Sequence, residues 1–169
     1  KDKDYHFEFT DSETKKSLFG GNMKSGHWSK CMVQRYIPYQ ISISSGSELL
    51  LDYKLDLKDK EVMIVLDSTS LGDSIAWFPY VEEFRKKHNC NVTCATNWPE
   101  LFVEPYPYIK FQPLNWSGNF YAVYMIGCYD DKKKSLFNYK EISLQGLASS
   151  ILGLPNVEVK PKITVINKE

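Results

Sequence analysis

Residues 61–88 read EVMIVLDSTSLGDSIAWFPYVEEFRKKH, and this stretch decides the fold. The apolar run 62–66 has the length and β-branched content of a buried parallel strand. A short polar loop follows, and residues 74–88 then carry apolar side chains about three apart, as an amphipathic helix does. Strand, loop and helix predict the first unit of a doubly wound α/β sheet, whose ligands bind beyond the carboxyl ends of the strands. The loop 67–73 is therefore the first candidate for a functional site.

The composition of this loop suits an anionic ligand. Ser68, Thr69 and Ser70 offer hydroxyl groups, Gly72 allows close backbone approach, and the helix start directs unpaired N–H groups at the loop. The glycine fingerprints of dinucleotide-binding loops and of P-loops are absent from it. Asp73 stands at the helix start, where an ordinary capping or first-turn acid is the simplest interpretation. The residues alone predict a ligand-binding loop and leave its ligand open.

Several separated blocks resemble one family. Ser70-Leu71-Gly72-Asp73, followed by Pro79, resembles the S-x-G-D…P opening of lipopolysaccharide heptosyltransferases, which use ADP-heptose. The longer run 67–84 is more similar to the bacterial autotransporter O-heptosyltransferases, which glycosylate hydroxyls of autotransporter adhesins. The resemblance continues through the stretches 86–90, 105–111, 144–145 and 151–154, and is weaker in residues 1–50.

Length and composition exclude several classes of protein. The chain of 169 residues is 43% apolar and 25% charged, which are globular values. Its 21 Lys and Arg balance 21 Asp and Glu, so nucleic-acid binding has no electrostatic support. No apolar run is long enough for a membrane span, and no signal peptide is recognisable, so we expect a cytoplasmic protein. The four cysteines have neither zinc nor redox spacing, and we expect buried, reduced thiols.

The chain divides into two predicted domains. Residues 1–59 predict a small β-rich domain of antiparallel strands, with alternating runs at 5–9, 35–43 and 48–57 and a turn at Gly20-Gly21-Asn22. Residues 60–169 predict a Rossmann-like domain. Pro38 indicates an edge strand or a bend. Pro79 leaves two alternatives: a kink within one helix, or a helix that begins at Pro79 after a short turn.

Further elements are predicted after residue 88. We expect strands at 92–95, around 109–111 and at 160–166, a short helix at 97–102 capped by Asn97 or Thr96, and a helix at 142–152 capped by Ser143. The stretch 120–128 is apolar on every side, and we favour a strand. The corner Asn97-Trp98 follows a strand, so it is a second candidate for ligand contact.

The resemblance implies a GT-B fold, in which two Rossmann-like halves enclose the active site. This chain resembles the β module and the amino, acceptor-side half, so we expect it to lack the nucleotide-sugar-binding carboxyl half. Asp73 matches the family's catalytic carboxylate, which would take the proton of the acceptor hydroxyl. We expect the substrate-binding residues to be Ser68, Thr69, Ser70, Leu71, Gly72, Asn97 and Trp98. Asp67 is expected to be a structural acceptor for N–H groups of the loop.

The resemblance also implies the substrates, ADP-heptose as donor and an autotransporter adhesin as acceptor protein. We expect no cofactor in this chain, because the iron site that the family carries on cysteines belongs to the carboxyl half. A non-catalytic binding or scaffold module and a transferase for another sugar remain alternatives. An oligomer with Trp28, Trp98 and Trp116 at its interfaces is also open. The sequence leaves the sugar, the acceptor and the assembly undecided.

Overall fold

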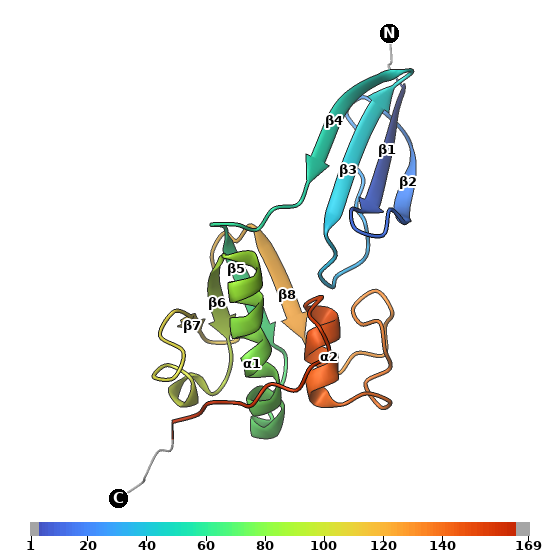
Figure 1. Ribbon diagram of the computed structural model, residues 1–169. Coiled ribbons are helices and arrows are strands. Elements are labelled where there is room, and N and C mark those ends of the chain that lie inside the picture. The colour runs from blue at the N-terminus through green and yellow to red at the C-terminus, as the bar shows by residue number, and fades with distance from the viewer. Residues whose placement is uncertain (1–3, 165–169) are drawn as a thin grey trace, which may run out of the picture. The chain divides into compact units, whose positions relative to one another are not determined.

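The structure, a computed structural model, describes residues 4–164 and contains two compact units (Figure 1). The first comprises residues up to 33 together with 37–56, and the second comprises residues 34–36 and those from 57 onward. Each unit has its own four-stranded sheet, antiparallel in the first and parallel in the second. The predicted fold class, an antiparallel β module followed by a Rossmann-like parallel sheet, is confirmed.

The first unit is an antiparallel sheet with the strand order β2-β1-β3-β4. Alternation in the run 5–9 correctly predicted a strand, and Phe7 is its buried residue. The strand predicted at 35–43 begins only after Pro38, and the strand predicted at 48–57 already ends at Lys54. The strands are β1 (Asp4–Asp11), β2 (Ser17–Lys24), β3 (Tyr39–Ser45) and β4 (Glu48–Lys54).

The predicted turn at Gly20-Gly21-Asn22 is wrong, because these residues lie inside β2. Gly20 pairs with Glu8 and Gly21 with Phe7 across the sheet. A Cβ atom on Gly20 would stand 3.0 Å from the carbonyl oxygen of Phe7. The glycines therefore permit a close approach of two strands, a role for glycine in sheets that a turn prediction overlooks.

The second unit is a parallel sheet with the order β7-β6-β5-β8. Its central strand is buried almost throughout, as the apolar run 62–66 predicted. The strand favoured for 120–128 is confirmed, although it is not buried on both faces: Tyr124 and Ile126 are buried, whereas Val123 and Met125 are exposed. The strands are β5 (Glu61–Leu66), β6 (Asn91–Ala95), β7 (Lys110–Gln112) and β8 (Ala122–Ile126).

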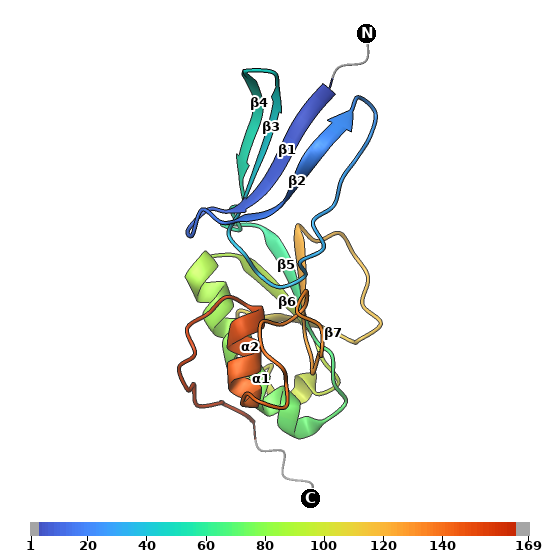
Figure 2. The same cartoon turned by 90° about the vertical axis from the view of Figure 1, so that its right-hand side faces the viewer.

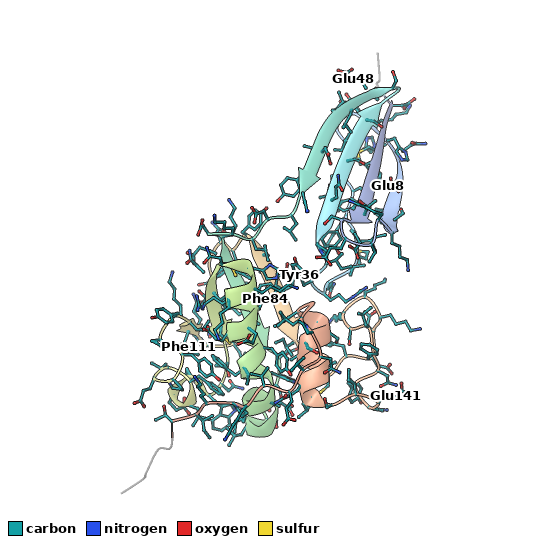
Figure 3. The ribbon with its side chains drawn as sticks, in the orientation of Figure 1. Glu8, Tyr36, Glu48, Phe84, Phe111 and Glu141 are labelled. Carbon is teal, nitrogen blue, oxygen red and sulfur yellow. The ribbon has the colours of Figure 1, made fainter. Side chains whose placement is uncertain are left out.

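Two helices, α1 (Leu71–His88) and α2 (Leu144–Ile151), pack together on one face of this sheet (Figure 2). On the other face, the connection between β7 and β8 packs Trp116 and Phe120 against Met63 and Val65. Tyr36 meets Phe84 of α1 edge to face, with ring centroids 5.6 Å apart (Figure 3). No helix within residues 4–164 has the length and apolar character needed to cross a membrane.

Helix α1 runs through Pro79 without interruption. The alternative in which the helix begins at Pro79 is therefore wrong. Proline removes one backbone hydrogen bond, but Pro79 is buried, and the adjacent Phe78 stacks on Phe102 with ring centroids 4.0 Å apart. Tertiary packing thus holds the helix together at a position where its backbone bonding is weakened.

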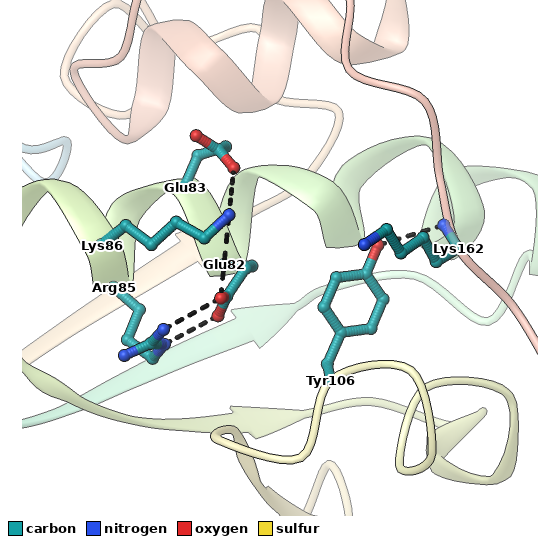
Figure 4. A network of polar contacts seen from close by, with 6 residues as sticks. All are labelled: Glu82, Glu83, Arg85, Lys86, Tyr106 and Lys162. Atoms are coloured by element: carbon teal, nitrogen blue, oxygen red, sulfur yellow. Dashed lines mark hydrogen bonds and ion pairs between the residues drawn. The ribbon is translucent and has the colours of Figure 1, made fainter.

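Polar contacts cover the outer side of α1 (Figure 4). Arg85 donates two hydrogen bonds to Glu82, at 2.7 and 2.9 Å, and Lys86 pairs with Glu83 at 3.0 Å. Nearby, the hydroxyl of Tyr106 accepts the backbone N–H of Lys162 at 3.1 Å. These partly exposed ion pairs contribute little stability individually.

Two other predicted elements differ from the structure. Residues 160–164 form no strand, because side chains such as Tyr106 hold this segment in place of a partner strand; residues 165 and 166 lie outside the described part. The short helix is a 3-10 turn, Pro99–Leu101, that starts at proline without a side-chain cap, so Asn97 and Thr96 are not its caps. The cap of α2 is Ser143, as predicted, which accepts the N–H of Gly146 at 3.0 Å.

The stacked pair Phe78 and Phe102 generates a stability prediction. Phe102 is fully buried, and its replacement by alanine would leave a cavity against Phe78. We expect Phe102→Ala to lower the free energy of unfolding by about 3–5 kcal/mol, measured by denaturant titration. The neighbouring Val103 is 53% exposed, so Val103→Ala is the control and should cost less than about 0.5 kcal/mol. Equal losses in the two variants would contradict this description of the core.

Candidate functional site

The candidate site lies where β5 and β8 end side by side. After β5 the chain turns sharply at Asp67, because the N–H of Ser68 bonds the carbonyl of Leu66 at 2.9 Å. The N–H of Asp67 reaches across to the carbonyl of Ile126, at the end of β8, at 2.8 Å. Helix α1 begins at Leu71, so the loop is shorter than predicted, and Gly72 and Asp73 belong to the first helical turn.

Asp73 is a half-buried residue in this first turn. The helix cap is Ser70, whose hydroxyl accepts the N–H of Asp73 at 3.4 Å, so Asp73 itself is a first-turn acid. Its Oδ2 accepts a hydrogen bond of 2.7 Å from the hydroxyl of Ser68. Among the described residues, none donates a hydrogen bond to Oδ1. One carboxylate oxygen is thus held, and the other remains available to a ligand.

The remaining residues predicted for the site differ in their contacts with the loop. Thr69, Ser70, Gly72 and Leu71 are exposed, and a Cβ atom on Gly72 would meet only the Ser70 hydroxyl, at 3.8 Å. From the end of β6, the indole Nε1 of Trp98 donates to the carbonyl of Thr69 at 3.3 Å. Trp98 therefore contacts the loop directly, whereas Asn97 lies exposed beside it.

Sequence reasoning missed one residue of this edge, Tyr129. Its hydroxyl donates to Oδ2 of Asp67 at 2.8 Å, so the described acceptor role of Asp67 is toward this phenol and not toward N–H groups of the loop. Burial, followed by the hydrogen bond to Asp67, raises the pKa of the Tyr129 phenol, which keeps it protonated as a donor. In the sequence, only the position of Tyr129 directly after the strand predicted within 120–128 could have indicated that it belongs to this edge.

The cysteines do not form a metal centre in the described part of the chain. Cys90 and Cys94 are buried, as expected, and burial raises the pKa of Cys90 to about 11. Cys31 is half-buried and Cys128 is exposed, so the expectation of a buried thiol is wrong for Cys128. Within residues 4–164, no three His, Cys, Asp or Glu side chains come together as metal ligands. The described residues therefore do not fit an iron site, and no chemistry is assigned through one.

Two cavities of the second unit lie away from the edge of the sheet that carries Asp67 and Asp73. One of about 390 Å³ is lined by Tyr80, Gln145 and Glu158, and another of about 550 Å³ lies between α1 and residues 154–159. Neither is lined by Asp73 or by the loop before it. Chemistry, rather than cavity size, therefore identifies the candidate site.

The parallel sheet, with a carboxylate just after one of its two interior strands, gives the chain the fold class of α/β proteins, in which ligands bind at the carboxyl edge of the sheet. No family model matches the chain. It is 32% identical to the autotransporter heptosyltransferase Aah of Escherichia coli, over 96% of this chain and 43% of Aah. It is 26% identical to BimC of Burkholderia thailandensis, an inactive autotransporter heptosyltransferase, over 96% of this chain and 40% of BimC.

Solved structures agree with these relatives. The crystal structure of TibC, an iron-containing dodecameric glycosyltransferase of enterotoxigenic E. coli, matches with a TM-score of 0.88 and 25% identity, covering 100% of this chain and 46% of TibC. TibC in complex with ADP-D-beta-D-heptose matches with a TM-score of 0.87 and 26% identity. The chain is therefore related to the autotransporter heptosyltransferases, as its motifs indicated, and spans less than half the length of these relatives.

The position of Cys128 gives a pH-dependent test of the site. Although Cys128 is exposed, partial desolvation and then the nearby charge of Asp73 raise the pKa of its thiol, so the reactive thiolate forms only at higher pH than usual. We expect Asp73→Asn to lower this pKa and to accelerate alkylation of Cys128 at pH 8, measured by peptide mass spectrometry. Asp59→Asn, at the opposite end of β5, is the control and should leave the rate unchanged. Identical rates in all three proteins would place Asp73 and Cys128 apart.

Proposed function

We propose that this chain is the acceptor-side portion of a glycosyltransferase that transfers heptose from ADP-heptose to a hydroxyl of an acceptor protein, an autotransporter adhesin. The observation that carries the proposal is the position of Asp73, at the start of α1 with one oxygen held and one available. Its motif matches the family's catalytic carboxylate, and the relatives Aah and TibC are heptosyltransferases. ADP-heptose binding by TibC supports the same donor here.

In the proposed reaction, Asp73 acts as the general base. An alcohol is a weak nucleophile near pH 7, and a carboxylate within hydrogen-bond reach removes its proton as the new bond forms. The acceptor oxygen bonds to the anomeric carbon of heptose, and the bond from that carbon to the diphosphate breaks, so ADP leaves with the electron pair. Ser68 would hold Oδ2 of Asp73 so that Oδ1 faces the alcohol.

The proposal assigns different tasks to different parts of the enzyme. Residues 1–59 and 60–169 would be the β-rich and acceptor-side domains of a GT-B enzyme, and a further Rossmann-like half would bind most of the ADP-heptose. We place the protein in the cytoplasm, where free thiols such as the four in this chain stay reduced. TibC is dodecameric, which supports an oligomer for this protein as well.

A second candidate is a module that binds an adhesin or a nucleotide sugar without catalysis. The observation that favours it is the relative BimC, an inactive autotransporter heptosyltransferase with 26% identity over 96% of this chain. Transfer by the full-length protein separates the two candidates, because a binding module alone would hold its ligands without forming product.

Asp73→Asn is the test of the proposed base. In the full-length protein we expect heptose transfer to fall by about 10²–10⁴-fold, measured as the mass gained by the acceptor. Asparagine can still accept the Ser68 hydrogen bond, so the cost in stability should be only the lost charge at a helix start, about 0.3–1 kcal/mol. A variant that is strongly destabilised, yet keeps its specific activity, would show that Asp73 is structural.

A further inference from the structure

A second carboxylate stands at the same edge of the sheet. Asp67 is exposed beyond the carboxyl end of β5, and its Oδ2 accepts the phenol hydrogen of Tyr129 at 2.8 Å. Among the described residues, none donates a hydrogen bond to its Oδ1. Asp67 and Asp73 therefore share a pattern, in which a hydroxyl donor holds one oxygen of each and leaves the other open.

The surroundings of Tyr129 are built to hold its ring in this place. A Cβ atom on Gly127 would stand 2.7 Å from Cζ and 2.8 Å from the hydroxyl oxygen of Tyr129, so only glycine leaves room for the ring. The N–H of Tyr129 bonds the carbonyl of Gly127 at 3.1 Å, which closes a tight turn after β8. Lys134 Nζ lies 4.4 Å from the ring centroid, within cation–π distance.

Charge restricts what this edge can bind. Asp67 in the loop and Asp73 in the first turn of α1 disfavour the anionic ligand that the loop composition predicts, such as the diphosphate of a nucleotide sugar. A neutral alcohol can instead donate a hydrogen bond to either carboxylate. The loop between them is tied to β8 through Asp67 and to the segment after β6 through Trp98 and Thr69. The braced loop thus holds Asp67 directly and Asp73 through the hydroxyl of Ser68, and the part of a substrate that suits them is hydroxylated and uncharged.

We propose that Asp67, oriented by Tyr129, is a substrate-binding residue that accepts a hydrogen bond from a hydroxyl group of the sugar or of the acceptor. Tyr129 is the positioning residue for Asp67, because the Tyr129 hydroxyl donates its hydrogen bond to Asp67 and the Tyr129 ring lies against Gly127 and Lys134. This inference rests on the proposed function, since it assigns a second contact to the same substrates. In this proposal Asp67 binds a substrate hydroxyl, whereas Asp73 removes the proton of the attacking hydroxyl.

Steady-state kinetics of the full-length protein test the assignment. Asp67→Asn should raise the KM of one substrate about tenfold, the value of one hydrogen bond to a charged group, with kcat within about threefold of wild type. Tyr129→Phe keeps the ring and should raise the same KM by a smaller factor. A rise in the KM of ADP-heptose assigns the hydroxyl to the sugar, and a rise in that of the acceptor assigns it to the acceptor. Asp59→Asn is the charge-matched control.

Equilibrium binding separates this inference from the proposed function. Titration of the protein with ADP-heptose and with acceptor, each alone, requires no turnover. If transfer is never seen but Asp67→Asn still weakens one of these ligands about tenfold, the proposed function fails and the role of Asp67 stands. If transfer occurs while both affinities and both KM values stay at wild-type levels in Asp67→Asn, the role of Asp67 is overturned, and a loss confined to kcat overturns it as well.

Discussion

The hydrogen bond from the Ser68 hydroxyl to the Asp73 carboxylate is the contact on which the account of the site depends. It joins the loop after β5 to the first turn of α1, and it engages Oδ2 of Asp73, while no donor among the described residues binds Oδ1. Ser68 also accepts the N–H of Ser70, whose hydroxyl caps the helix. Capping and orientation of the acid are thus one connected network, so the ordinary role of an acid at a helix start and a catalytic role do not exclude each other.

The parallel sheet brings the rest of the site together. Strands β5, β6 and β8 run in the same direction, so the residues that follow them meet at one edge although they are far apart in sequence. Asp67, Trp98 and Tyr129 follow these three strands. Trp98 donates a hydrogen bond to Thr69 of the loop after β5, and Tyr129 donates one to Asp67 at the start of that loop. Such a braced loop holds its side chains in place before a substrate arrives, which is what electrostatic catalysis requires.

Local pattern predicted the parts of the fold that depend on local chemistry. The buried run of β5, the cap Ser143 and the loop before Asp73 were readable because strand composition, capping and turn residues act over a few positions. Tertiary pairing decided the rest. Gly20 and Gly21 are typical turn residues, but they pair with β1 across the sheet. Pro79 is typical of a helix start but lies inside α1, and the hydroxyl of Tyr129 binds Asp67, 62 positions away in the sequence. The resemblance supplied the catalytic assignment of Asp73, which the residues alone left open.

The central claim is that the side chain at position 73 faces the attacking alcohol. A crystal structure of the full-length Asp73→Asn protein with ADP-heptose and an acceptor would test it most directly, because the variant would hold both substrates without turnover. We expect the acceptor hydroxyl within about 2.6–3.2 Å of the residue 73 side chain, on the side away from Ser68. An acceptor hydroxyl bound elsewhere, with residue 73 turned into the protein, would contradict the account.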